Sequence, residues 1–259
     1  MENNPLLVPG RRLIIAHRGA SAEAPENTLE AFQLGLDQGA DALEMDVRLT
    51  QDGEAVVIHD STLDRTTDRG GVVAELTLQQ VQAARAGTGG QIPTFRSVLE
   101  AFPRTPLLVE IKAAEAQDAV AVEIERADAR DRVVIASFQH RALEKLRDGR
   151  FLIGADRGDV ATLYALGRFR LEKLASSCRC YAVPWRWKGK LEVPRPWFIA
   201  AATRLERAVH VWTVDDPAIA RLLWDRGAAG IITNRPALIK GGVRGERGER
   251  GERGERGER

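Results

Sequence analysis

Short apolar runs alternate with longer segments of helical periodicity along most of the chain. Runs of this length, rich in Val, Ile, Leu and Ala, are typical of strands buried in a parallel sheet. Eight such strands are predicted, at Leu13–Ala16, Ala42–Leu49, Leu107–Ile111, Val133–Phe138, Phe151–Ala155, Tyr181–Val183, Val209–Val214 and Gly230–Thr233.

The segments between these strands predict helices. They are Asn27–Gln38, Thr94–Phe102, Glu115–Ala127, His140–Arg147, Val160–Leu174, Trp197–Arg207 and Pro217–Arg226. Pro25 precedes the first helix and Gly39 fits its end, while Glu26, Asn27 and Thr28 are candidates to cap its start. Alternating strands and helices imply a parallel sheet with right-handed crossovers, and eight such units close naturally into an α/β barrel of the TIM type, (β/α)8.

The second strand carries an addition to this alternation. Asp52-Gly53 predicts a tight hairpin turn, with the chain returning through Ala55–Ile58. The segment at about 60–92 is rich in Thr, Gly and Asp and predicts a small insertion outside the barrel. The alternative fold is an open doubly wound sheet, which the absence of a G-x-G-x-x-G sequence after the first strand disfavours.

The chain therefore divides into an N-terminal extension (1–12), a barrel (13–240) and a tail (241–259). From Arg244 onward the tail repeats Gly-Glu-Arg and offers no apolar residue to bury, so we expect it to be disordered.

Composition narrows the class of protein. The 259 residues are 44% hydrophobic, which is enough for one sizeable core. The chain has 38 Lys and Arg against 37 Asp and Glu, so it lacks the basic excess of a nucleic-acid binder.

No run has the apolar length of a membrane span, and residues 1–12 lack a signal-peptide pattern, so we expect a cytoplasmic protein without stable membrane insertion. Cys178 and Cys180 are too few for a structural zinc site and are expected to be ordinary strand residues. The oligomeric state is left open.

Acidic residues occur where the second and third barrel strands should reach the active-site end of the barrel. Glu44 and Asp46 lie two residues apart in one strand and so point to the same side, and Glu110 occupies a similar place in the next strand. Buried carboxylates repel one another unless a cation compensates, and oxygen ligands suit Mg²⁺ or Ca²⁺. The alternative is a structural ion pair of Glu44 with Arg48 or Lys112.

Two of the four histidines fall at the same end of the predicted barrel. His17 closes the first strand and His59 closes the hairpin return, which makes them candidates for proton transfer. His140, at a helix start, and His210, at the start of a strand at the far end of the barrel, are predicted to be structural or surface residues.

Basic and aromatic residues complete the predicted site. Arg18 and Lys112 are the candidates to bind a phosphate, by a planar fork and by a point charge respectively. Charge balance of the carboxylates is the alternative role for Lys112. Phe138 and Trp212 are assigned to the substrate pocket, with a core position as the alternative for Trp212.

Several blocks of sequence resemble, in order, those of the glycerophosphodiester phosphodiesterase family. The blocks are AHRGASAEAPENTLEAF at 16–32, ALEMDVRLTQDGEAVVIHDSTLDRTT at 42–67, VEIK at 109–112, SF at 137–138, VWTV at 211–214 and GIITNRP at 230–236. HRG alone is a weak signal, but the ordered set spans about 13–239 and is specific.

The resemblance implies a TIM-type barrel and a reaction that splits a small-molecule glycerophosphodiester into an alcohol and sn-glycerol 3-phosphate. It implies one divalent cation on Glu44, Asp46 and Glu110, His17 and His59 as the acid/base pair, and Arg18 and Lys112 at the phosphate. Attack by water and attack by a neighbouring glycerol hydroxyl, through a cyclic phosphate, both remain open. So does the choice of acid between the two histidines.

Departures and alternatives remain. Family members commonly carry Asp where this chain has Ala229 and Asn234; neither belongs to the implied metal or proton set, although Asn234 could alter the bracing of the barrel mouth. Segment 178–196 matches no family block and is a candidate to shape specificity for the alcohol. The alternative substrates on the same barrel are those of a lysophospholipase D or a phosphoinositide-type phosphodiesterase, which no basic patch supports. A non-enzymatic polyol-phosphate binder would be expected to lack a histidine or carboxylate of the site, and all five are present.

Overall fold

The computed structural model describes residues 4–87, 89–172 and 178–242. Eight parallel strands form its central sheet: β1 (Leu13–His17), β2 (Ala42–Leu49), β6 (Leu107–Ile111), β7 (Val133–Ala136), β8 (Leu152–Ile153), β9 (Cys180–Pro184), β12 (Ala208–Trp212) and β13 (Gly230–Thr233). They pair in the order β8-β7-β6-β2-β1-β13-β12-β9, and β3 (Ala55–Val57) adds an antiparallel strand to β2. The predicted hairpin is confirmed.

Two backbone hydrogen bonds join the ends of this sheet. The amide of Ala155 donates to the carbonyl oxygen of Cys180 at 2.9 Å, and the amide of Arg179 donates to that of Ile153 at 2.7 Å. Because these bonds link β8 to β9, the sheet closes on itself, and the TIM-type barrel predicted from the sequence is confirmed.

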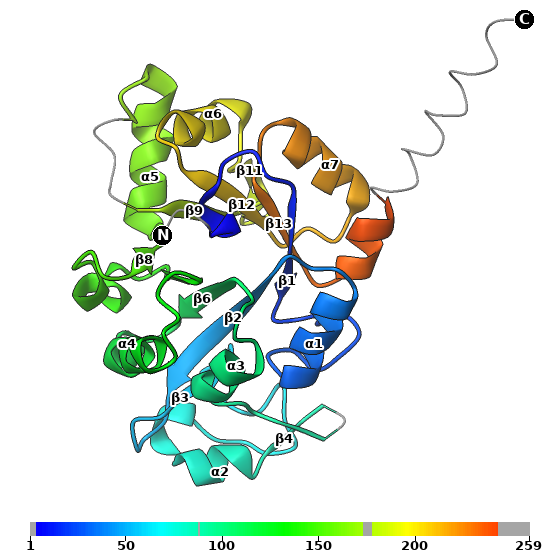
Figure 1. Cartoon of the computed structure of the whole chain (residues 1–259), viewed down its shortest axis with the longest axis vertical. Coiled ribbons are helices and arrows are strands. Elements are labelled where there is room, and N and C mark those ends of the chain that lie inside the picture. Colours follow the sequence, from blue (N-terminus) through cyan, green and yellow to red (C-terminus); the bar gives the residue numbers. More distant parts are fainter. Residues whose placement is uncertain (1–3, 88, 173–177, 243–259) are drawn as a thin grey trace, which may run out of the picture.

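Helices surround the barrel (Figure 1). They are α1 (Leu29–Asp37), α3 (Phe95–Ala101), α4 (Gln117–Arg126), α5 (Arg157–Leu166), α6 (Pro196–Arg204), α7 (Pro217–Asp225) and a last helix at 236–242. Thr28 caps α1, because its side-chain oxygen accepts a hydrogen bond from the amide of Ala31 at 3.1 Å. Among the described residues, no helix combines the length and the apolar character that crossing a bilayer requires.

Two helix predictions need correction. Segment 140–147 forms two short 3-10 turns, η4 (His140–Ala142) and η5 (Glu144–Leu146), instead of an α-helix. The backbone amide of Lys145 donates a hydrogen bond to the side-chain oxygen of Gln117. This tertiary contact takes the place of the bond that the amide would make within an α-helix. Helix α5 begins earlier than predicted, at a capping box formed by Asp156 and Asp159, and ends at Leu166.

The insertion after the hairpin forms a small unit against β3. It contains η2 (Val73–Glu75), α2 (Leu78–Gln82), β4 (Arg85–Ala86) and β5 (Gly90–Gln91). Its buried side chains form a separate cluster that includes Ile58, Leu63 and Val81. The segment before α6 carries a second small hairpin, β10 (Arg186–Trp187) and β11 (Leu191–Glu192).

The N-terminal segment closes the end of the barrel opposite the active-site face. The short 3-10 helix η1 (Pro5–Leu7) places Leu6, fully buried, among barrel-interior residues such as Ile15. His210 is fully buried inside β12, neither at the strand's start nor at the surface, and its Nε2 donates to the carbonyl oxygen of Leu6 at 2.8 Å.

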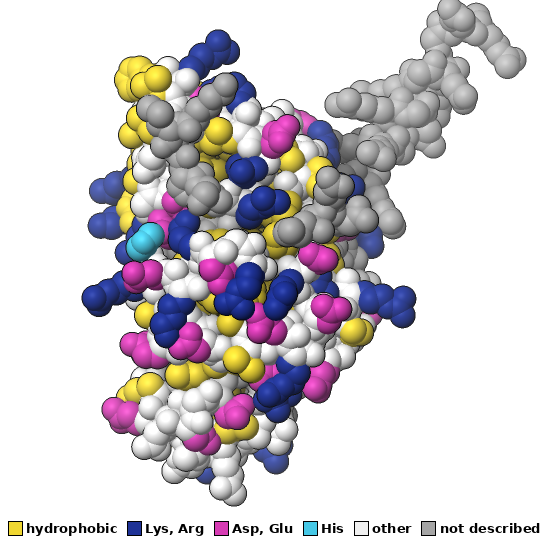
Figure 2. Space-filling view, turned by 60° about the vertical axis from the view of Figure 1, so that its left-hand side comes forward, with side chains coloured by type: hydrophobic (Ala, Val, Ile, Leu, Met, Phe, Trp, Pro, Cys, Tyr) yellow, Lys and Arg dark blue, Asp and Glu magenta, His cyan; other side chains and the backbone are white. Residues whose placement is uncertain are grey.

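Cys178 and Cys180 are both fully buried, and Cys180 begins β9. On the face shown in Figure 2, acidic and basic side chains are interspersed. The Gly-Glu-Arg repeat from Arg244 onward lies outside the described residues.

The environment of His210 makes stability depend on pH. Burial lowers the pKa of His210 to about 4. Among the described residues no group accepts a hydrogen bond from its buried Nδ1, so a second ring proton would be left without a partner. The unfolded chain, with a histidine pKa of about 6.5, binds the proton more readily.

We therefore expect this contribution to the free energy of unfolding to be complete above about pH 6.5. It should be lost as the pH falls toward about 4, by at most about 1.4 kcal/mol per pH unit. Urea unfolding of wild type and His210→Gln at pH 7 and pH 5 measures it. The glutamine variant should lose less stability between the two, and an identical loss in both proteins would contradict the assignment.

Candidate active site

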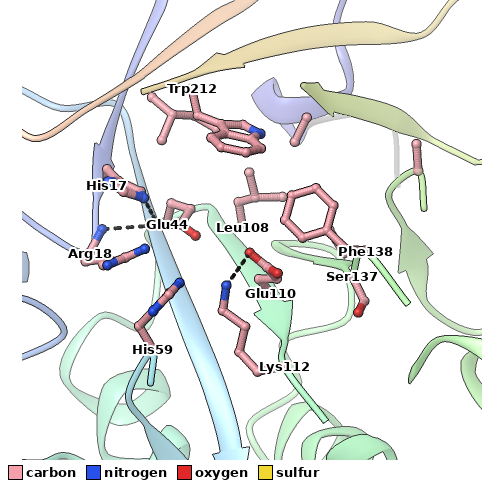
Figure 3. Close-up of a pocket in the computed structure, with 14 residues that line it drawn as sticks. His17, Arg18, Glu44, His59, Leu108, Glu110, Lys112, Ser137, Phe138 and Trp212 are labelled. Carbon is pink, nitrogen blue, oxygen red and sulfur yellow. Dashed lines mark hydrogen bonds and ion pairs between the residues drawn. The ribbon is translucent and has the colours of Figure 1, made fainter. Parts of the chain in front are cut away.

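The residues predicted for the site converge on one cavity of about 150 Å³ at the C-terminal ends of the strands (Figure 3). Eight of the nine line it: His17, Arg18, Glu44, His59, Glu110, Lys112, Phe138 and Trp212. The ninth, Asp46, is buried beside them, with Oδ1 2.9 Å from Nζ of Lys112 and Oδ2 3.0 Å from Nε of Arg18. One cavity therefore collects side chains from β1, β2, β6 and β12 and from the segments that follow β1, β3, β6 and β7.

The register of the parallel strands brings the three acidic residues together. Glu44 pairs with His17 across β1 and β2, and Asp46 pairs with Glu110 across β2 and β6. As a result Glu44, Asp46 and Glu110 each place a carboxylate oxygen within 4.8 Å of the other two. Oxygen donors grouped this closely fit a hard divalent cation.

Their charges are only partly balanced by the protein. Burial, and then the neighbouring Asp46 and Glu110, raise the pKa of Glu44 well above its usual value. Among the described residues no Lys or Arg side chain pairs with Glu44, so the expected alternative, an ion pair with Arg48 or Lys112, is wrong. Its Oε2 accepts a hydrogen bond from the backbone amide of Arg18 at 3.1 Å.

The other two carboxylates share Lys112. Burial opposes ionisation of Asp46, but Lys112 and Arg18 outweigh it and lower its pKa. Burial raises the pKa of Glu110, although its Oε2 lies 2.8 Å from Nζ of Lys112. Lys112 thus balances carboxylate charge, as its alternative role required, and also faces the cavity. Two cations lie beside three carboxylates, two of them buried and one half-buried, and a divalent cation would offset any remaining negative charge.

His17 is held by a hydrogen-bond chain from the last strand. Nδ2 of Asn234 lies 2.8 Å from Oδ2 of Asp215, and because a carboxylate accepts, the amide oxygen of Asn234 must face His17. That oxygen lies 2.7 Å from Nδ1 of His17, so Nδ1 carries the proton and Nε2 keeps its lone pair, 3.9 Å from Oε2 of Glu44. Burial, and then the Arg18 guanidinium, lower the pKa of His17.

His59 reaches the cavity from the segment after β3. The amide of Ile58 donates to the carbonyl oxygen of Asp46 at 3.0 Å, and Nε of Arg48 donates to that of His59 at 2.8 Å. Nδ1 of His59 lies 2.6 Å from Oδ1 of Asp60, which forms an ion pair with the ring when the ring is protonated. These contacts leave the Nε2 side of the ring toward the cavity (Figure 3).

Three supporting residues were not predicted for the site. Asn27 and Glu26 were expected to cap α1, but Nδ2 of Asn27 donates to Asp46 at 3.1 Å, and Glu26 pairs with Arg18 at 3.0 Å. Arg65, from the insertion, donates two hydrogen bonds to Glu26, both at 2.8 Å. A left-handed φ of 60° at Asn27 turns its side chain away from the helix, and a pattern of residue types carries no signal for that.

The aromatic residues form one wall of the cavity. The rings of Phe138 and Trp212 meet edge to face with their centroids 5.6 Å apart. Both side chains are partly exposed to the cavity, so Trp212 is not a core residue alone.

A closed (β/α)8 barrel whose mouth combines acidic oxygens, paired imidazoles and fixed cations defines a class of protein, the barrel enzymes that act on anionic esters. The sequence profile of the "Glycerophosphoryl diester phosphodiesterase family" matches residues 17–238. The chain belongs to this family, and the enzyme class expected from the sequence is confirmed.

Individual relatives agree with this assignment. Glycerophosphodiester phosphodiesterase of Caldanaerobacter subterraneus subsp. tengcongensis is 31% identical over 240 residues, which cover 87% of this chain and 95% of the relative. The crystal structure of the Thermotoga maritima glycerophosphodiester phosphodiesterase matches with a TM-score of 0.72 and 29% identity, over 89% of this chain and 98% of that one. An Oleispira antarctica phosphodiesterase, solved with its product sn-glycerol-3-phosphate, shares the fold with a TM-score of 0.74 and 24% identity, over 89% and 96%.

The turn after β1 generates a stability prediction. Gly19 has a φ of 84°, and a Cβ there would lie 2.4 Å from the carbonyl carbon of Ala31 in α1. Gly53 has a φ of 83° with no atom within 4 Å of such a Cβ, which makes it a matched control. Gly53→Ala should cost about 1 kcal/mol of left-handed strain, and Gly19→Ala should cost several times more. Urea unfolding of the two variants measures this, and equal losses would refute it.

Proposed function

We propose that this protein hydrolyses glycerophosphodiesters to an alcohol and sn-glycerol 3-phosphate, with one divalent cation held by Glu44, Asp46 and Glu110. The observation that carries the proposal is the convergence of these carboxylates within 4.8 Å, beside two imidazoles in one cavity. Mg²⁺ and Ca²⁺ are the cations that such oxygen donors favour. Once bound, the cation would supply positive charge to the phosphoryl oxygens.

Arg18 and Lys112 are proposed to hold the substrate's phosphate. Both line the cavity, and both already lie beside Asp46. Glu26 pairs with the guanidinium of Arg18 and is itself held by Arg65. The Arg18 side chain is therefore already ordered, and little conformational entropy is lost when the phosphate binds. Fixed cations of this kind stabilise charge that develops on the phosphoryl group in the transition state.

The two histidines are proposed to divide the proton transfers. Nε2 of His17, unprotonated because Asn234 holds the proton on Nδ1, accepts the proton of the attacking hydroxyl. His59, which Asp60 pairs with when protonated, donates a proton to the leaving alkoxide. A new P–O bond forms as the bond to the leaving alcohol breaks, and one proton enters the protein as another leaves.

Removing either imidazole tests this division. His17→Ala and His59→Ala should each lower kcat on glycerophosphocholine by about 10²–10⁴-fold, while circular dichroism and calorimetric Mg²⁺ or Ca²⁺ binding show a folded protein that still takes the cation. His140→Ala is the control, because His140 lies outside the cavity. Turnover near the wild-type rate in both site variants would rule out the scheme.

Cation dependence has its own test. EDTA should abolish release of glycerol 3-phosphate, and added Mg²⁺ or Ca²⁺ should restore it. Glu110→Gln should raise the cation concentration needed for half-maximal rate, because one ligand loses its charge, while Glu115→Gln, at an exposed position, should not. Full activity in EDTA, or equal cation requirements for the two variants, would remove the cation from the proposal.

A further inference from the structure

A second cavity, of about 370 Å³, lies beside the first. Helix α5, strand β9 and the hairpin β10–β11 surround it, with side chains such as Val160, Tyr164 and Val193 on its walls. Phe138, Ala155 and Ala182 line both cavities, so the second adjoins the place where the phosphate would sit. Its volume falls within the roughly 300–1,000 Å³ of small-molecule sites.

The walls of this second cavity are mostly apolar. The carboxylate of Asp156, one of its two charged lining residues, is occupied by the amide of Asp159 and by His140 and Arg147. The hairpin also leaves two large apolar side chains facing solvent, Trp187 at 39% and Leu191 at 43% exposure, and both line the cavity. A polar group entering here would lose hydration with little in return.

Arg157, the other charged lining residue, disfavours cationic ligands. Its guanidinium carbon lies 5.3 Å from the ring centroid of Phe138 and 5.9 Å from that of Trp187. Two of the aromatic rings that could attract an ammonium group, Phe138 and Trp187, therefore already lie against a cation, which would repel choline or ethanolamine.

We propose that this second cavity binds an alkyl or acyl chain carried by the leaving alcohol, so that the preferred substrates are glycerophosphodiesters of apolar alcohols. This rests on the proposed function. The glycerol moiety has two free hydroxyls that need polar partners, and those partners surround the first cavity. The group that reaches past Phe138 into the apolar space is then the alcohol on the other side of the phosphate.

A series of substrates differing only in the alcohol tests the proposal: sn-glycero-3-phospho-ethanol, -butanol and -octanol, with release of glycerol 3-phosphate as the readout. In the wild type, kcat/KM should rise about fourfold per buried methylene until the cavity is filled. It should be lower for glycerophosphocholine than for the butanol ester. A flat series, or a preference for glycerophosphocholine, would overturn the proposal.

Two variants on α5 locate the effect. Ala161 lines the second cavity and its neighbour Thr162 does not. Ala161→Trp should lower the octanol-to-ethanol ratio of kcat/KM by at least tenfold, and Thr162→Trp should retain the wild-type ratio. Equal ratios in the two variants would contradict this placement.

The end of the substrate is tested separately. Lysophosphatidylcholine carries its chain on the glycerol, and faster cleavage of it than of the octanol ester would assign the cavity to the wrong end. If no diester releases glycerol 3-phosphate, the proposed function itself fails and this proposal falls with it. Glycerol 3-phosphate release with no dependence on chain length refutes the substrate class alone.

Discussion

Mutual repulsion among three carboxylates at the barrel mouth is the constraint on which the rest of the site depends. Glu44, Asp46 and Glu110 are fixed within 4.8 Å by strand register, so the protein cannot relieve their repulsion by moving them apart. The surrounding residues partly balance that charge. Lys112 and Arg18 form ion pairs with Asp46, and the backbone amide of Arg18 donates a hydrogen bond to Glu44. Clustered carboxylates of this kind favour binding of a cation, and the cation together with Arg18 and Lys112 would then attract an anionic ligand.

The two ends of the barrel differ in the side chains that fill them. At the N-terminal end Leu6 and His210 fill the interior and take no part in the site, while the polar side chains gather at the other end. Supports for the site come from distant parts of the chain. Asn234 orients His17 from the segment directly after β13, and Arg65 reaches Glu26 from the insertion. The insertion is therefore tied, through Glu26, to Arg18 at the cavity.

The wall of the barrel mouth away from the carboxylates is mostly apolar. There Phe138 lines both the charged cavity and an apolar one formed mainly by α5, β9 and the hairpin β10–β11. The segment at 178–196 contributes Ala182, Pro184, Trp187, Leu191 and Val193 to the walls of this second cavity. The carboxylates and the apolar walls thus lie mostly on separate elements of one barrel, so the apolar walls can change without disturbing the carboxylates.

The sequence by itself determined the barrel and most of the site, because strand runs, helical periodicity and residues at strand ends are local patterns. It placed Glu44, Asp46, Glu110, His17 and His59 at one mouth, since the ends of parallel strands must meet there. Tertiary structure alone decided the remaining contacts. The Asn27 side chain donates a hydrogen bond to Asp46 instead of capping α1. The Gln117 side chain accepts a hydrogen bond from the segment at 140–147, which therefore forms no α-helix. His17 gains its tautomer from Asn234, 217 residues away. Each of these depends on a side-chain direction or a distant partner, which no local pattern of residue types can specify.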